Sequence, residues 1–246
     1  MRILIGGMVA AVLAAVVVGV FALGGEGVSF ANAADRMQGK SVRSTMTMAM
    51  SVQGTDVTMK GTALQSADLK RYKMDLKGGV GGADISQTLV MVGKDLWVSS
   101  PSFTELLPEG KRWVHATDEA MADLGSMSFE DLMAFCEAAT DIEKRGETEI
   151  DGVKATHYVG AVDLAAAAKR LGRGPDAFGD AGKTPLEVWL DPNGNALRIK
   201  MDLVIEGGKA TITMDDFEYD VDTSSIKAPP AGETVDDAEV GIFSQS

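Results

Sequence analysis

The residues that could take part in catalysis are few in this chain, and they lie far apart. The two histidines, His115 and His157, lack a carboxylate or cysteine at the spacing that metal ligands need. The single cysteine, Cys136, falls on the apolar face of a predicted helix, where we expect a small buried side chain; a reactive thiol or an intermolecular disulfide is the alternative. No acid, base and nucleophile stand out together, so we expect no enzyme.

Two further segments match binding loops only in part. The glycine-rich run at 78–82 lacks the Gly-Lys-Ser/Thr ending of a phosphate loop. Four polar residues match the ligand positions of a calcium loop: Asp191, Asn193, Asn195 and Asp202. However, Ala196 stands where that loop requires glycine, and residues 196–205 alternate as a strand does. The sequence therefore predicts no metal site and no cofactor.

The sequence does contain a broad apolar surface on predicted strands. Residues 185–205 alternate apolar and polar on both sides of Asp191-Pro192-Asn193-Gly194, which predicts a β-hairpin with a tight turn. Residues 44–52 alternate in the same way, with methionine at three positions of one face. The chain has 14 methionines and only 6% aromatic residues. Because methionine is flexible and polarizable, this face suits an irregular apolar partner. From the residues alone a packed core is the simpler interpretation, and a ligand cavity is the alternative.

Short strands joined by turns surround this surface. We expect strands at 57–61, 69–76, 85–92, 96–99, 111–116, 142–150, 153–162 and 210–219, and helices at 28–37, 121–139 and 164–171. Loops are expected at 78–82 and 173–184, as mobile flaps or as simple surface loops. The pattern predicts an α+β, mainly β fold in which one antiparallel, strongly curved sheet holds one or two helices.

The N-terminus predicts a membrane segment. Residues 3–23 are apolar without a charge and would span a bilayer core as a helix. Because Arg2 precedes this run and Glu26 follows it, the rest of the chain is expected outside the cytoplasm. We favour a retained single-pass anchor at 1–25; a cleaved signal peptide and a secreted protein are the alternative.

Composition limits the remaining functions. Residues 26–230 fit one domain, and 231–246 are expected to form an acidic, flexible tail. The formal charge of −13 argues against nucleic acid as a partner and against electrostatic docking on anionic lipid.

Several short segments, in this order, resemble the LppX–LprAFG family of actinobacterial envelope lipoproteins. They are Lys111-Arg112-Trp113-Val114, residues 146–153, Ala155-Thr156-His157-Tyr158-Val159, Val162-Asp163-Leu164, residues 185–203 and Ala228-Pro229-Pro230. Together the resemblance covers roughly residues 28–235. The chain departs from the family in one respect, since it has no cysteine before Cys136 and therefore no lipobox.

The resemblance implies a LolA-like half-open barrel whose hydrophobic cavity holds a lipid or an acylated glycolipid. On that basis the lining is expected to include Met46, Met48, Met50, Met59, Met74, Leu89, Met91, Val188, Leu190, Leu197, Ile199, Met201, Leu203 and Ile212. The function implied is transfer of lipid across the cell envelope, with an envelope transporter or acceptor protein as a partner. The alternative is a membrane-anchored sensor or protein-interaction domain of the same fold with a filled core.

Overall fold

The computed structural model describes residues 39–52, 55–80, 83–104, 106–116, 139–170, 182–205 and 208–242. The predicted membrane segment, the first helix, the helix containing Cys136 and most of the loop at 173–184 lie outside these residues. None of the helices in the described ranges has the length and apolarity needed to cross a membrane.

Strands make up most of the described chain, as the alternating sequence predicts. The first six are β1 (Val42–Val52), β2 (Thr55–Gln65), β3 (Arg71–Val80), β4 (Ala83–Val92), β5 (Asp95–Ser99) and β6 (Trp113–Ala116). The others are β7 (Ala139–Ile150), β8 (Val153–Asp163), β9 (Lys183–Leu190), β10 (Ala196–Ile205), β11 (Gly208–Tyr219) and β12 (Thr234–Asp236). Short helical turns accompany them: α3 (Pro101–Thr104), α6 (Leu164–Arg170), η1 (Ala231–Glu233) and α7 (Asp237–Val240).

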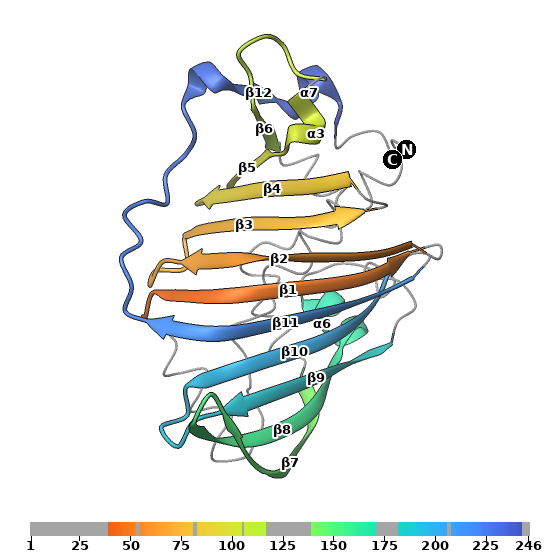
Figure 1. Ribbon diagram of the computed structural model, residues 1–246, viewed down its shortest axis with the longest axis vertical. Coiled ribbons are helices and arrows are strands. Elements are labelled where there is room, and N and C mark those ends of the chain that lie inside the picture. Colours follow the sequence, from red (N-terminus) through yellow and green to blue (C-terminus); the bar gives the residue numbers. More distant parts are fainter. Residues whose placement is uncertain are drawn as a thin grey trace.

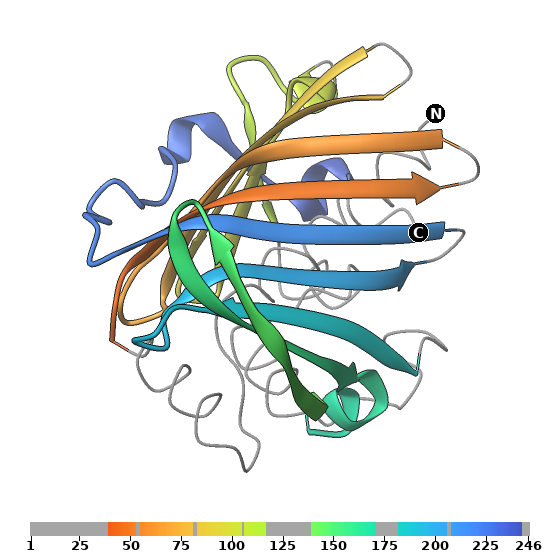
Figure 2. The ribbon, with the colours of Figure 1, turned by 60° about the horizontal axis from the view of Figure 1, so that its bottom comes forward.

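All of these strands belong to one 12-stranded sheet in the order β12-β6-β5-β4-β3-β2-β1-β11-β10-β9-β8-β7. The sheet is open and strongly curved (Figures 1 and 2). Neighbouring strands are antiparallel except for β12, which runs parallel to β6. The prediction of a mainly β protein with one curved, largely antiparallel sheet is therefore confirmed.

The hairpin turns form where the sequence supplies residues that tolerate positive φ. Asp151 and Gly152 have φ of 51° and 81° between β7 and β8, and Gly194 has φ of 83° between β9 and β10. Asp191 also stabilises the second turn, because its carboxylate accepts hydrogen bonds from the backbone N–H groups of Asn193 and Asn195 at 2.7 and 2.8 Å. Three of the residues that match a calcium loop thus act within the turn itself, whereas Asp202 lies in β10 and accepts a hydrogen bond from Thr211.

Two glycines allow the backbones of β2 and β3 to approach each other closely. A side chain at Gly61 would place its Cβ 1.7 Å from the carbonyl oxygen of Asp75, and one at Gly78 would lie 2.2 Å from that of Thr58. Gly78 was expected in a loop at 78–82, but β3 continues to Val80. That expectation was wrong because a glycine can stay in a strand where neighbouring backbones come close.

A register shift in β10 changes which residues of the predicted hairpin face the interior. Ala196 pairs with Leu190, whereas Arg198 pairs with Trp189, so Leu197 is the extra residue of a bulge. Ala196 is therefore buried and Leu197 only half-buried. Strict alternation from Leu197 onward was the expectation, and the bulge is the reason that it fails at this end of the strand.

The acidic C-terminal segment was expected to be a flexible tail, but residues 231–240 form η1, β12 and α7. From the end of β11 the chain runs past the ends of β1 to β4 and then reaches β6 (Figure 1). We call residues 220–236 the strap. Ser41 donates to the carbonyl of Val221 at 2.6 Å, and Ile226 and Val235 are buried. The pairing of β12 with β6 and the burial of Ile226 and Val235 therefore hold this acidic segment against the sheet.

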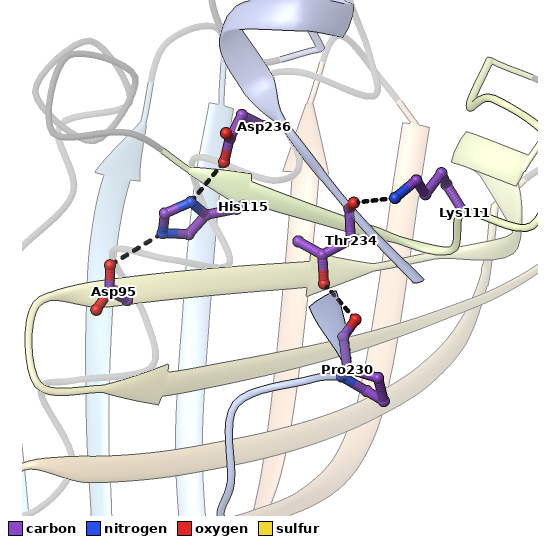
Figure 3. A network of polar contacts seen from close by, with 6 residues as sticks. All are labelled: Asp95, Lys111, His115, Pro230, Thr234 and Asp236. Atoms are coloured by element: carbon purple, nitrogen blue, oxygen red, sulfur yellow. Dashed lines mark hydrogen bonds and ion pairs between the residues drawn. The ribbon is translucent and has the colours of Figure 1, made fainter. Parts of the chain in front are cut away.

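A polar cluster fixes the strap to the edge of the sheet (Figure 3). His115 lies between Asp236 of β12 at 2.7 Å and Asp95 of β5 at 3.0 Å, and its ring stacks on Trp97. Lys111 donates to the carbonyl of Thr234 at 2.7 Å. The strap is thus held by His115 of β6 and by Lys111 just before β6, both more than a hundred residues earlier in the chain.

Replacing Gly61 by alanine should destabilise the fold, because the new methyl group would collide with the backbone of β3. We expect the free energy of unfolding in a denaturant titration to fall by roughly 1–3 kcal/mol or more. Gly232→Ala is the matched control, since no heavy atom lies within 4 Å of its added Cβ. Equal denaturation midpoints for the two variants would show that β2 and β3 do not approach each other in this way.

Val235→Asp should detach the strap, because it places a carboxylate against Val114 at a buried position of β12. We expect the backbone amides of β6 to exchange hydrogen faster and the strap to be cleaved more readily by a protease. Val153→Asp makes the same change at an exposed position and should leave both unchanged. Wild-type exchange at β6 in the Val235 variant would contradict the pairing.

Candidate functional site

The most distinctive feature of the sheet is a set of buried methionines on one face. We define the methionine face by Met46, Met48, Met50, Met59, Met74, Met201 and Met214, all of which are almost completely inaccessible to solvent. They belong to one apolar core together with buried residues of the other strands. Alternation along each strand puts all of them on the same side of the sheet, which we call the inner face.

The strand register lines these side chains up in rows that cross the sheet. One row runs Leu186–Met201–Ile212–Met48–Met59–Gly78–Ile85, from β9 to β4. The next runs Val188–Ile199–Met214–Met46–Gly61–Leu76–Gln87. Directly opposed residues of neighbouring strands have side chains in contact range. The first row is therefore apolar throughout, the second is apolar from Val188 to Leu76 and ends at Gln87, and the two rows lie side by side.

The structure brings most of the predicted lining residues together. Eleven of them are buried on the inner face: Met46, Met48, Met50, Met59, Met74, Leu89, Val188, Leu190, Ile199, Met201 and Ile212. Met91 is partly buried and packs against this core. Leu197 is displaced by the bulge described above. Leu203 pairs with Ala210 through its backbone, and its side chain lies outside what the structure describes.

Sequence reasoning missed several members of the inner face. Met214 is buried in these rows although it was not expected there, and Leu186, which alternation already places on the apolar face of the hairpin at 185–205, was left out of the expected lining. Both lie at in-phase positions of strands that were expected, so extending the alternation along each whole strand would have found them. Ala63 and Ala210 contribute small side chains between the methionines, and alanine gives no strong periodic pattern of its own.

The polar side chains that the strand register places on the inner face, such as Gln65, Gln87 and Tyr72, are neutral. The buried polar side chains include Gln65 and Gln87, and no lysine or arginine of the described residues is buried. Burial raises the pKa of Tyr72 far above its usual value, so its hydroxyl stays protonated. A surface of this kind can accept a large apolar group, whereas an ion would find no opposite charge.

The second histidine, His157 of β8, lies on the outer face of the sheet, opposite Trp189 of β9. His157 stacks on Trp189 with ring centroids 4.3 Å apart, and its Nε2 lies 3.0 Å from a carboxylate oxygen of Glu187. Lys200 donates to the other oxygen of Glu187 at 2.9 Å, and this hydrogen bond raises the pKa of the lysine. These contacts join β8, β9 and β10 on the side of the sheet away from the methionines.

The carboxylates around the histidines do not form a metal site. Asp236 and Asp95 bind opposite nitrogens of the His115 ring, so their oxygens cannot converge on one ion. Within the described part of the chain, no group of three or more histidine, cysteine or carboxylate side chains is arranged to hold a metal.

Comparison with known proteins gives few relatives by sequence. No protein-family model matches the chain. It is 26% identical over 155 residues to an uncharacterized 31.2 kDa protein in the rplA-rplJ intergenic region of Streptomyces griseus, a match that covers 53% of this chain. The chain spans about half the length of this curated relative (50%).

Solved structures similar to this one include two members of the family that the sequence resembles. LprF from Mycobacterium bovis has a TM-score of 0.49 at 15% identity, covering 81% of this chain and 94% of that one. The lipoprotein LppX from Mycobacterium tuberculosis has a TM-score of 0.42 at 15% identity, covering 75% and 89%. A putative outer membrane lipoprotein-sorting protein domain from Vibrio parahaemolyticus has a TM-score of 0.32 at 10% identity, covering 79% and 92%. Since these TM-scores lie below 0.5, the function proposed below rests on the chain's own residues.

Proposed function

We propose that this chain is an extracytoplasmic lipid-binding protein that shields acyl chains on the methionine face during transfer across the cell envelope. The fold would be a LolA-like half-open barrel with a hydrophobic cavity, held at the membrane by residues 3–23. Its partners would be a lipid or acylated glycolipid and an envelope transporter or acceptor protein. No covalent chemistry is required, because removing apolar area from water stabilises the complex by about 25 cal/mol per Å².

The observation that carries this proposal is the run of methionines across five strands of one curved sheet. A sheet interior that only had to be filled would more often use β-branched residues, which pack well on a pleated surface. Methionine has three rotatable bonds and a polarizable sulfur, so it adapts to chains of different length and shape. Met46, Met48 and Met59 lie at the centre of the rows, where an acyl chain would make the most contact.

One observation favours the alternative function, a sensor or interaction domain with a filled core. Met46, Met48 and Met59 have a relative exposure of 0% within the protein itself. A lipid would therefore have to displace the groups that now cover them. In the alternative these covering groups stay in place, and the domain contacts another protein through its outer surface.

Native mass spectrometry of the full chain, produced in a host with an actinobacterial envelope, tests the proposal directly. We expect adducts with the mass of a lipid that disappear after organic extraction. A folded protein that carries no lipid adduct would contradict lipid binding and support the sensor or interaction domain.

Ala210→Phe separates a ligand cavity from a filled core. Ala210 is buried on the inner face opposite Met50, so a benzyl group there would occupy space needed by an acyl chain. In a lipid-binding protein we expect loss of most of the co-purified lipid with a retained fold. In a filled core, overpacking should lower stability by roughly 1–3 kcal/mol instead. Ala49→Phe, on the exposed face of the neighbouring strand β1, should affect neither lipid nor stability.

A further inference from the structure

One buried polar group on the inner face is left without a partner. Gln87 of β4 has a relative exposure of 6%. Its Nε2 makes no hydrogen bond, and it is the one buried side-chain nitrogen or oxygen atom of the described residues for which this holds. A buried amide N–H without an acceptor loses its hydration and gains nothing in return, so such groups call for a specific explanation.

The strand register places this amide on the methionine face. Gln87 lies opposite Leu76 of β3, in the row that continues through Gly61 to Met46 and Met214. Its neighbours at i±2, Ile85 and Leu89, belong to the same apolar core. Thr88 points the other way and donates to a carboxylate oxygen of Asp75 at 2.8 Å. The Gln87 amide is thus a hydrogen-bond donor at the β4 end of an otherwise apolar band.

The surroundings of Gln87 select the kind of acceptor that fits. An amide N–H needs an oxygen acceptor, and an oxygen that reaches this position must enter together with apolar chains. A carboxylate or phosphate would bring a charge to a face where no lysine or arginine of the described residues is buried. A neutral carbonyl carries the acceptor without that charge. The carbonyl oxygen of an acyl ester has this chemistry and is bonded directly to an acyl chain.

We propose that Gln87 is the polar anchor of the ligand: its Nε2 donates a hydrogen bond to an ester carbonyl of a neutral, acylglycerol-type lipid whose chains lie along the methionine face. This assignment rests on the proposed lipid-binding function and narrows it. The lipid is an ester rather than a free fatty acid, and one ester group lies at β4 while the chains extend toward β1 and β11.

Two glycerolipids that differ only at the carbonyl test the anchor. Dipalmitoyl glycerol carries ester carbonyls, and dihexadecyl glycerol has ether links of similar shape with none. Native mass spectrometry of the full chain, released from detergent and titrated with each lipid, gives their relative affinities. We expect the wild-type protein to prefer the ester by roughly three- to ten-fold, the usual net effect of one hydrogen bond.

Gln87→Met keeps the length of the side chain and removes the donor. We expect it to bind both lipids equally, with its affinity for the ether unchanged, and to unfold at a higher temperature than the wild type because no buried donor is left unpaired. Gln65→Met makes the same change at another buried glutamine, two rows away in β2, and should retain the ester preference. Gln87→Leu repeats the test if the methionine variant does not fold, which far-UV circular dichroism detects.

The outcomes separate the anchor from the proposed function. If the wild-type protein binds both lipids with equal affinity, or if Gln87→Met keeps the ester preference, the anchor is wrong while lipid binding stands. Tighter binding of palmitate than of dipalmitoyl glycerol would overturn the choice of a neutral ester. If the wild-type protein binds neither glycerolipid nor palmitate, the proposed function fails, and the anchor fails with it.

Discussion

Exclusion of water from one face of a single sheet is the constraint on which the rest of this structure depends. Seven methionines and their aliphatic neighbours line that face, and burying each such side chain stabilises the fold by about 1.5–3 kcal/mol. A flat sheet would leave such a surface open to solvent unless another layer covered it. Because the sheet is strongly curved (Figures 1 and 2), the two ends of each row approach each other, which reduces the apolar area exposed to water.

The curvature has local causes in the chain. Gly61 and Gly78 permit backbone contacts between β2 and β3 that any side chain would prevent. The bulge at Leu197 shifts the register between β9 and β10, and bulges of this kind increase the local twist. Small changes at single residues therefore shape the surface that larger apolar side chains fill.

The two edges of the sheet are protected in different ways. At one edge, β7 carries closely spaced charges, including Glu143, Lys144 and Arg145, which discourage pairing with another chain. At the other edge, β12 covers β6, and the His115 cluster holds it there. The strap also links β11, in the middle of the sheet, to this far edge by running past the ends of β1 to β4 (Figure 1).

The sequence by itself determined the mainly β fold, the turns at Asp151-Gly152 and Asp191-Pro192-Asn193-Gly194, and most of the methionine face, because period-2 alternation and turn chemistry are local properties. Only the tertiary structure decided the strand order, the pairing of β12 with β6, the carboxylates around His115 and the isolated amide of Gln87. These features join residues that are distant along the chain. Backbone pairing and desolvation decide whether these contacts form, and neither can be predicted from the spacing of residue types along the chain.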